Sequence, residues 1–288
     1  MQYLLILFAC TIATAKMLVH RQFGKNNVKT LADAALFYFG IFLVSSLLFC
    51  YRMPSATAVC WLYAALFGLF SAVFQLFYTR ALATGPISLV GLLINLAMLI
   101  PVVFSAIAYS EPITPLCAVG ILLILVSFAL CVERGSGKRH AAKGKEWIFY
   151  AIVTMLANGA CSVVQKIYVK TDATADGQVF TACCYLTAAV LCLAYYLFAR
   201  SRGGKAGYPV GRSFFGYVLA IGLLLGGFQA INTYAVSVIP GTLFFPAYYG
   251  TSIIIAMLAG VLVCKDKLKP RQLAAILVGV VAVVLVNL

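Results

Sequence analysis

The stretch QLFYTRALATGP, residues Gln75–Pro86, recurs later in the chain as QAINTYAVSVIP, residues Gln229–Pro240. The two segments are identical at four of twelve positions, including the first Gln and the last Pro. Their offset of 154 residues exceeds half of the 288-residue chain. Apolar composition alone does not supply matching Gln, Thr and Pro residues, so the match indicates an internal repeat.

A second match lies further along each copy. The segment SEPITPLCAVGILL (Ser110–Leu123) aligns with KDKLKPRQLAAILV (Lys265–Val278) at an offset of 155 residues. This alignment places Glu111 opposite Asp266, each just before an apolar run. Two independent segments with nearly the same offset therefore predict two copies of one unit.

The repeat also divides the chain. Lys16, in the first apolar run, corresponds to Lys166 in the sixth. We expect a first five-helix repeat over residues 1–133, a basic connecting loop over 134–145 and a second five-helix repeat over 146–288.

Composition fixes the environment of these repeats. The chain is 64% hydrophobic and 10% charged, and its mean hydropathy is +1.04. Soluble domains are typically about 45–50% apolar and about 25% charged. These values exclude a soluble globular enzyme and a disordered basic tail, and they predict a membrane-embedded protein. A β-barrel is excluded too, because its strands alternate polar and apolar residues, whereas here the apolar runs are continuous and helix-length.

The apolar runs number ten, and about 20 apolar residues suffice for one helical crossing of a membrane. They are broken at turn dipeptides such as Gly85-Pro86 and Pro240-Gly241. An odd number of crossings in each half means that the second half enters the membrane from the opposite side. The sequence therefore predicts an all-α integral membrane fold with ten transmembrane helices in two inverted five-helix repeats. The runs lie at about 3–19, 34–50, 58–79, 87–109, 115–132, 147–169, 179–199, 214–238, 243–264 and 273–288.

The basic residues carry topology information. The chain has 21 Lys and Arg against 7 Asp and Glu. Most of the basic residues follow the first, fifth, seventh and ninth runs, whereas the other face receives only Arg52 and Lys170. By the positive-inside rule the crowded face is cytoplasmic, which predicts a multi-pass protein of the cell membrane with both termini outside. Anionic membrane lipids are the natural partners of these basic loops, and a nucleic-acid partner is not expected.

These features together resemble the drug/metabolite transporter superfamily, specifically its ten-helix EamA type. The resemblance rests on the five-plus-five helices, the lysines Lys16 and Lys166, and the acids in SEPIT and KDKLK. The sequence departs from the family where a Gly usually precedes the acid, because Ser110 and Lys265 stand there. The resemblance implies a central cavity enclosed by helices 1, 3, 4, 6, 8 and 9. It also implies cytoplasmic termini, contrary to the charge count.

Candidate site residues are polar groups within the spans. Asn158, Ser162 and Gln165 share one helical face beside Lys166, and charge or polarity in hydrocarbon is a mark of function. Two alternatives stand beside this interpretation: the lysines can snorkel to the interface, and the amides can stabilise helix packing. The predicted substrate-binding set is Lys16, Gln75, Tyr78, Asn95, Asn158, Ser162, Gln165, Lys166, Gln229, Asn232 and Tyr249.

Small residues and prolines predict packing and bending. Gly222 and Gly226 lie on one face of their helix and are expected to form a packing surface rather than a ligand site. Proline interrupts a helix because it lacks an N–H and its ring clashes with the carbonyl four residues earlier. The prolines expected to act as hinges or kinks are Pro86, Pro101, Pro240 and Pro246.

The function expected from these features is secondary transport. We predict that the chain moves a small metabolite, whether neutral, zwitterionic or anionic, by alternating access through a cavity between the repeats. Efflux of toxic or lipophilic compounds and a non-transporting membrane subunit or lipid-handling scaffold are the alternatives. An enzyme is not expected, because His20 and His140 lie in loops. No metal or other cofactor is predicted, since the ten cysteines follow no metal-ligand spacing.

Overall fold

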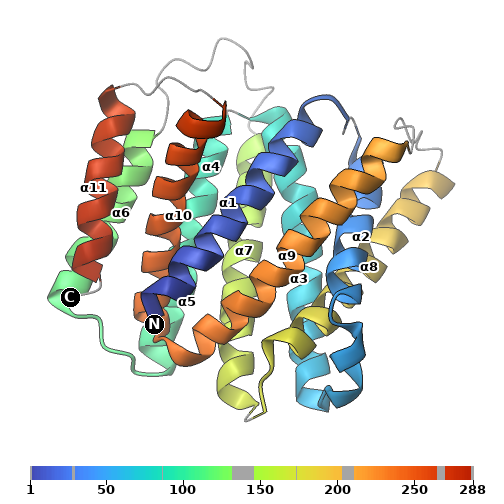
Figure 1. Ribbon diagram of the computed structural model, residues 1–288, viewed down its shortest axis with the longest axis horizontal. Helices are drawn as coiled ribbons and strands as arrows, with labels where there is room; N and C mark the ends of the chain where they lie inside the picture. Colours follow the sequence, from blue (N-terminus) through green and yellow to red (C-terminus); the bar gives the residue numbers. More distant parts are fainter. Residues whose placement is uncertain are drawn as a thin grey trace.

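The computed structural model describes residues 2–27, 30–85, 87–131, 146–172, 174–202, 211–264 and 270–286, which fold into helices with no strand among them (Figure 1). Within these ranges six helices are long and apolar enough to cross a membrane, and four shorter helices are also apolar. The predicted all-α membrane fold of two inverted repeats is confirmed. The elements are α1 (Gln2–Asn27), α2 (Leu31–Leu47), η1 (Cys50–Ser55), α3 (Ala58–Thr84), α4 (Ile87–Asn95), η2 (Leu96–Met98), α5 (Leu99–Ala108), α6 (Pro115–Cys131), α7 (Glu146–Thr171), α8 (Gly177–Ser201), α9 (Arg212–Val238), α10 (Gly241–Cys264) and α11 (Pro270–Val286).

Some predictions fall on residues outside these ranges. They are the hinge at Pro86, the acid Asp266 and the connecting loop 134–145.

The two repeats are interlocked rather than packed as separate bundles. One buried cluster joins α2 and α3 of the first repeat to α7, α8 and α9 of the second. A second cluster joins α1, α5 and α6 to α9, α10 and α11. Helix pairs such as α3 with α7, and α6 with α11, therefore bring together segments far apart in the chain (Figure 1). Any site in the middle of the molecule is consequently built by both repeats.

The outer surface of the helices is apolar. Large hydrophobic side chains such as Leu62, Ile107 and Leu122 are more than half exposed. A soluble protein rarely leaves apolar surface of this extent uncovered, whereas lipid covers it in a membrane. The exposed surface thus agrees with the apolar composition.

Local sequence signals explain where several helices begin. At the start of α2, Thr30 Oγ1 accepts a hydrogen bond from the Asp33 N–H (3.1 Å), and Asp33 Oδ2 accepts one from the Thr30 N–H (3.1 Å). This capping box satisfies N–H groups that have no partner within the helix. At the start of α3, Thr57 Oγ1 accepts from the Cys60 N–H at 3.0 Å.

Pro101 and Pro246, two of the prolines expected to act as hinges or kinks, lie in different local structure. The fourth crossing is interrupted by the 3₁₀ segment η2, which includes the residue four positions before Pro101. Clash of the proline ring with the carbonyl four residues earlier accounts for this interruption. Pro246 lies within α10 without interrupting it. Only the first of these two crossings is therefore broken near its middle.

The predicted role of the two glycines of α9 is confirmed. A Cβ at Gly222 would lie 2.6 Å from Val44 Cβ, and one at Gly226 would lie 3.1 Å from the Ser45 carbonyl oxygen. The Ser45 hydroxyl also donates to the Gly222 carbonyl at 2.8 Å. These glycines form a close helix–helix contact between α9 and α2.

The connections sort into two ends because the helices run alternately up and down the bundle (Figure 1). We use "the Arg52 end" for the end formed by η1, the α5–α6 connection, the α7–α8 connection and the α9–α10 connection. The N-terminal start of α1 and the C-terminal end of α11 belong to this end as well.

Candidate functional site

The polar face of α7 contacts α9, α10 and the α5–α6 connection, and so residues of both repeats. Asn158 and Ser162 are half-buried, whereas Gln165 and Lys166 are buried, with 2% and 1% of their surfaces exposed. Their spacing places them along one side of the helix, as the sequence predicts. What each side chain contacts differs strongly along this face.

Gln165 connects α7 to α9. Its Nε2 donates to Thr233 Oγ1 at 2.8 Å, and its Oε1 accepts from Asn232 Nδ2 at 3.0 Å. Gln229 Nε2 also donates to Thr233 Oγ1, at 3.3 Å, and Tyr185 donates to Gln229 Oε1 at 3.3 Å. Three residues of the predicted set, Gln165, Gln229 and Asn232, thus meet in one buried hydrogen-bonded group.

The Thr233 hydroxyl fixes the orientation of these amides. It has one hydrogen, which it donates to the Gln229 main-chain carbonyl at 2.9 Å. Both approaching amides must therefore present N–H groups to it, which turns the Gln165 oxygen toward the Asn232 amide nitrogen. The remaining oxygen, Asn232 Oδ1, is buried and has no hydrogen-bond partner among the residues that the structure describes. Because an unmet acceptor in a buried place is costly, it is a position that a hydrogen-bond donor would occupy favourably.

Asn158 contacts α10 rather than α9. Its Nδ2 donates to the Tyr249 hydroxyl at 3.1 Å, which joins two more residues of the predicted set across α7 and α10. Tyr249 packs edge-on against Tyr248, whose ring lies 5.8 Å from that of Phe228 on α9. The amides of α7 are therefore bordered by an aromatic cluster.

Lys16 lies against this aromatic cluster. Its Nζ is 5.4 Å from the centre of the Phe228 ring, a cation–π contact, and its side chain is half-buried. It makes no ion pair with any residue that the structure describes. Phe228 precedes Asn232 by four residues on α9, so the lysine and the unpaired oxygen belong to one side of that helix.

Lys166 has a different partner. Its Nζ lies 2.9 Å from Glu111 Oε1 and 3.5 Å from the Ile239 carbonyl oxygen. The Glu111 side chain is only 11% exposed, and its other oxygen accepts from the Thr242 N–H at 3.1 Å. The snorkelling alternative is therefore wrong for Lys166, because the chain turns its ammonium toward a buried carboxylate. Its predicted role as a substrate ligand stays a prediction.

The predicted residues of the first repeat are less connected. The Gln75 carbonyl accepts from Thr79 within α3, and Tyr78 stacks on Phe74 at 5.7 Å. Asn95 is half-buried at the last residue of α4, just before η2, and it makes no side-chain hydrogen bond with another described residue. The structure therefore joins the second-repeat residues closely and leaves these three separate.

Several contributing residues were not in the predicted set, among them Thr233, Glu111 and Phe228. Glu111 was identified only as an acid near a helix start, and Phe228 was not singled out. A signal for Glu111 was available, because the repeat alignment gives each half one lysine and one acid of opposite charge. No sequence signal distinguishes Phe228 from the other 19 phenylalanines.

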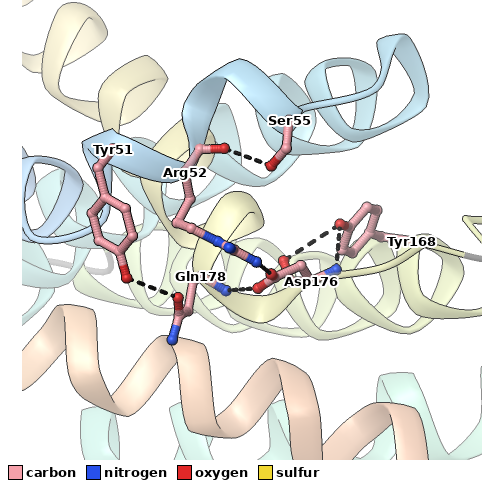
Figure 2. A network of polar contacts seen from close by, with 6 residues as sticks. All are labelled: Tyr51, Arg52, Ser55, Tyr168, Asp176 and Gln178. Atoms are coloured by element: carbon pink, nitrogen blue, oxygen red, sulfur yellow. Dashed lines mark hydrogen bonds and ion pairs between the residues drawn. The ribbon is translucent and has the colours of Figure 1, made fainter.

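A polar network covers the Arg52 end. Figure 2 shows Arg52 aimed at Asp176, with 2.6 Å between Nη2 and Oδ2, and Tyr51 donating to Gln178 Oε1 at 3.2 Å. Asp176 also begins α8, since its Oδ1 accepts from the Gln178 N–H at 2.7 Å. The residues around this network line a cavity of about 190 Å³.

The aspartates of this network are held ionised. Partial burial acts to raise the pKa of Asp176, but Arg52 and main-chain N–H groups outweigh it and lower this pKa below its ordinary value. Asp172 accepts from Thr57 Oγ1 at 2.6 Å and from the Thr174 hydroxyl at 2.7 Å. These hydrogen bonds outweigh partial burial and lower the pKa of Asp172 too.

Comparisons with known proteins cover nearly the full length of the chain. One solved crystal structure, described only as that of a protein, matches with a TM-score of 0.69 and 21% sequence identity, covering 99% of this chain and 95% of the other. That likeness shows a shared fold. A search of curated proteins finds no match. The family model described as the EamA-like transporter family matches residues 1–132 and 145–288. The chain therefore belongs to the EamA-like transporter family.

Proposed function

We propose that the chain is a secondary transporter that carries a small metabolite by alternating access between its two repeats. Membership of the EamA-like transporter family supports this proposal. The polar groups of α7 and α9, with Lys16 nearby on α1, supply a site between helices of different repeats. Inverted repeats that rock around such a site are a common arrangement in secondary transporters.

The difference between the contacts of Lys16 and Lys166 supports a proposal for the charge of the substrate. Lys166 is neutralised by Glu111, whereas Lys16 contacts the Phe228 ring and no described carboxylate. A cation within a membrane span favours an anionic partner strongly, because water screens it little there. We therefore propose an anionic or zwitterionic metabolite whose negative group binds Lys16.

The second subsite is hydrogen-bonding. The buried Asn232 Oδ1 has no donor within the described part of the chain, and the half-buried Asn158 and Ser162 lie on the neighbouring helix. An N–H or O–H group of the metabolite satisfies the free acceptor. A hydrocarbon-like compound offers nothing to either subsite, so these groups favour a polar metabolite over a lipophilic one.

Solute counterflow in proteoliposomes tests the proposal, with metabolites grouped by charge. We expect Lys16→Ala to abolish counterflow of anionic solutes and to leave that of neutral solutes. Lys170→Ala is the matched control, because Lys170 also lies over an aromatic ring, at 5.7 Å from the Tyr109 centre, but is exposed at the Arg52 end. Wild-type anion transport by Lys16→Ala contradicts the proposed substrate class. No counterflow for any solute contradicts transport and favours a non-transporting membrane subunit.

We further propose that the protein resides in the cell membrane with its termini outside and its basic loops against anionic lipids. The uneven distribution of basic residues supports this orientation. A Gln2→Cys variant probed with a membrane-impermeant thiol reagent tests it, after background labelling of Cys50, which is exposed, is removed by Cys50→Ser. Labelling of intact cells is expected, and labelling only after permeabilisation contradicts the orientation.

A further inference from the structure

Glu111 belongs to the first repeat, but both of its carboxylate oxygens bind the second repeat. Oε1 pairs with Lys166 on α7 at 2.9 Å, and Oε2 accepts the Thr242 N–H at the start of α10 at 3.1 Å. The start of a helix carries partial positive charge, so the carboxylate meets a full and a partial positive charge together. One side chain thus ties the α5–α6 connection to two helices of the other repeat.

Local backbone features hold Glu111 in this place. Ser110, the residue before it, has a φ of 50°, a left-handed conformation that turns the chain sharply. Gly241 leaves room on the other side, because a Cβ there would collide with Ser105 Oγ and lie 3.3 Å from Glu111 Oε2. A glycine at the first position of α10 therefore avoids a clash with Ser105 and a tight contact with the carboxylate.

A second group of contacts crosses between the repeats at the same end. Arg52 pairs with Asp176, and Tyr51 donates to Gln178 (Figure 2). Thr57 donates to Asp172 as well. In each pair the first residue comes from the first repeat and the second from the second repeat. This outer layer is partly solvated, with 45% of the Arg52 side chain and 29% of the Asp176 side chain exposed.

We infer that these two layers form the gate that closes the Arg52 end of the bundle, and that Glu111 is its principal residue. This inference rests on the proposed transport function, because alternating access requires the repeats to separate at one end in each cycle. The buried layer dominates, since an unpaired buried charge is costly whereas an exposed ion pair contributes little. Transport then requires Lys166 and the start of α10 to leave Glu111 while this end is open.

Reversible cross-linking across the outer layer tests the gate. Tyr51→Cys and Gln178→Cys are introduced into the Cys50→Ser background and joined with a short bifunctional thiosulfonate. We expect the cross-link to abolish counterflow and reductant to restore it. The matched control is Thr174→Cys with Gln178→Cys, which joins two positions of the second repeat at the same end and is expected to leave counterflow intact. Counterflow at the rate of the unlinked protein in the linked Tyr51/Gln178 variant overturns the gate.

A labelling measurement separates failure of the gate from failure of the proposed function, because it needs no substrate. Asn158→Cys is labelled in proteoliposomes with an impermeant maleimide added from the Arg52 side. We expect labelling to be slower than from the other side and to accelerate when Glu111→Gln is added. Equal labelling rates with and without Glu111→Gln overturn the gate, whether or not a transported solute has been found. Acceleration without any counterflow supports the gate and contradicts the transport proposal alone.

Discussion

Lys16 and Lys166 occupy equivalent positions in the two repeats, yet their surroundings differ. Lys166 is 1% exposed and bound to a carboxylate from the other repeat, whereas Lys16 is half-buried against an aromatic ring. The same residue type at equivalent positions therefore serves two purposes. Lys166 joins the two repeats through Glu111 near the Arg52 end. Lys16 contacts the Phe228 ring and pairs with no described carboxylate, which is why we propose it as the ligand for an anion.

The difference between the two lysines is whether a carboxylate of the protein neutralises the ammonium group. Within a membrane span a lysine must find a partner, because the cost of burying an unpaired charge is large. Lys166 has such a partner in Glu111. Among the described residues Lys16 has the Phe228 ring but no carboxylate, and on this difference we base the proposed binding of an anion.

The largest expected effect comes from removing Glu111. Glu111→Gln leaves the Lys166 ammonium buried without a counter-charge, and we expect the free energy of unfolding to fall by about 3–5 kcal/mol. Lys166→Met should cost less, because Glu111 keeps its hydrogen bond from the Thr242 N–H. Melting temperatures in detergent measure both.

The double variant Glu111→Gln with Lys166→Met sharpens this result. It removes both charges, so we expect it to be more stable than Glu111→Gln alone. If the double variant loses the sum of the two single losses, the residues do not act as a pair and the comparison of the two lysines fails.

Next in size is the effect on ligand binding at Lys16. In Lys16→Gln we expect the thermal stabilisation by anionic metabolites to disappear, whereas stabilisation by neutral metabolites persists. The melting temperature of the ligand-free protein should change little, since a cation–π contact contributes only about 0.5–2 kcal/mol. A large loss of stability without any loss of anion binding would assign Lys16 the structural role that Lys166 has.

A smaller effect is expected where the backbone positions Glu111. Ser110 has a positive φ, which destabilises a non-glycine residue by roughly 1–2 kcal/mol. Glycine avoids this strain, but its greater freedom in the unfolded chain destabilises the folded state by about 0.5–1 kcal/mol. Ser110→Gly should therefore stabilise the protein by about 1 kcal/mol or less. Ser110→Ala is the control, because it keeps the strain while removing the hydroxyl, and equal melting temperatures for the two variants would contradict this account.

The smallest effect concerns the exposed ion pair. Because the folded pKa of Asp176 is depressed, its contribution to stability is present above the pKa of the unfolded chain, about 3.9, and is lost as the pH falls through the folded pKa. Asp176→Asn should accordingly lower the melting temperature slightly and by the same amount from pH 5 to pH 8. The difference between the variant and the wild type should shrink below about pH 4. A difference that varies between pH 6 and pH 8 would point to another titrating group.

Much of the fold follows from local sequence. Continuous apolar runs predict membrane helices, because only helices and closed β-barrels satisfy all backbone hydrogen bonds in lipid and barrel strands alternate polar and apolar residues. The matched segments around Gln75 and Gln229 predict the repeats. The start of α2 is also local, because Thr30 and Asp33 form the capping box there. The polar face of α7 follows as well, because helical periodicity alone places Asn158, Ser162 and Gln165 on one side.

Only the tertiary structure determines which residue of another helix each polar side chain contacts. The sequence supplied two lysines and a row of amides, but not that Glu111 crosses to the other repeat or that the Gln165 amide bonds to α9. These contacts join residues 55 to 131 positions apart and depend on how interlocked helices pack. Helical periodicity determines which side of a helix a residue occupies, whereas its partner is determined by long-range packing. That packing pairs Lys166 with Glu111 of the other repeat and places Lys16 against the Phe228 ring.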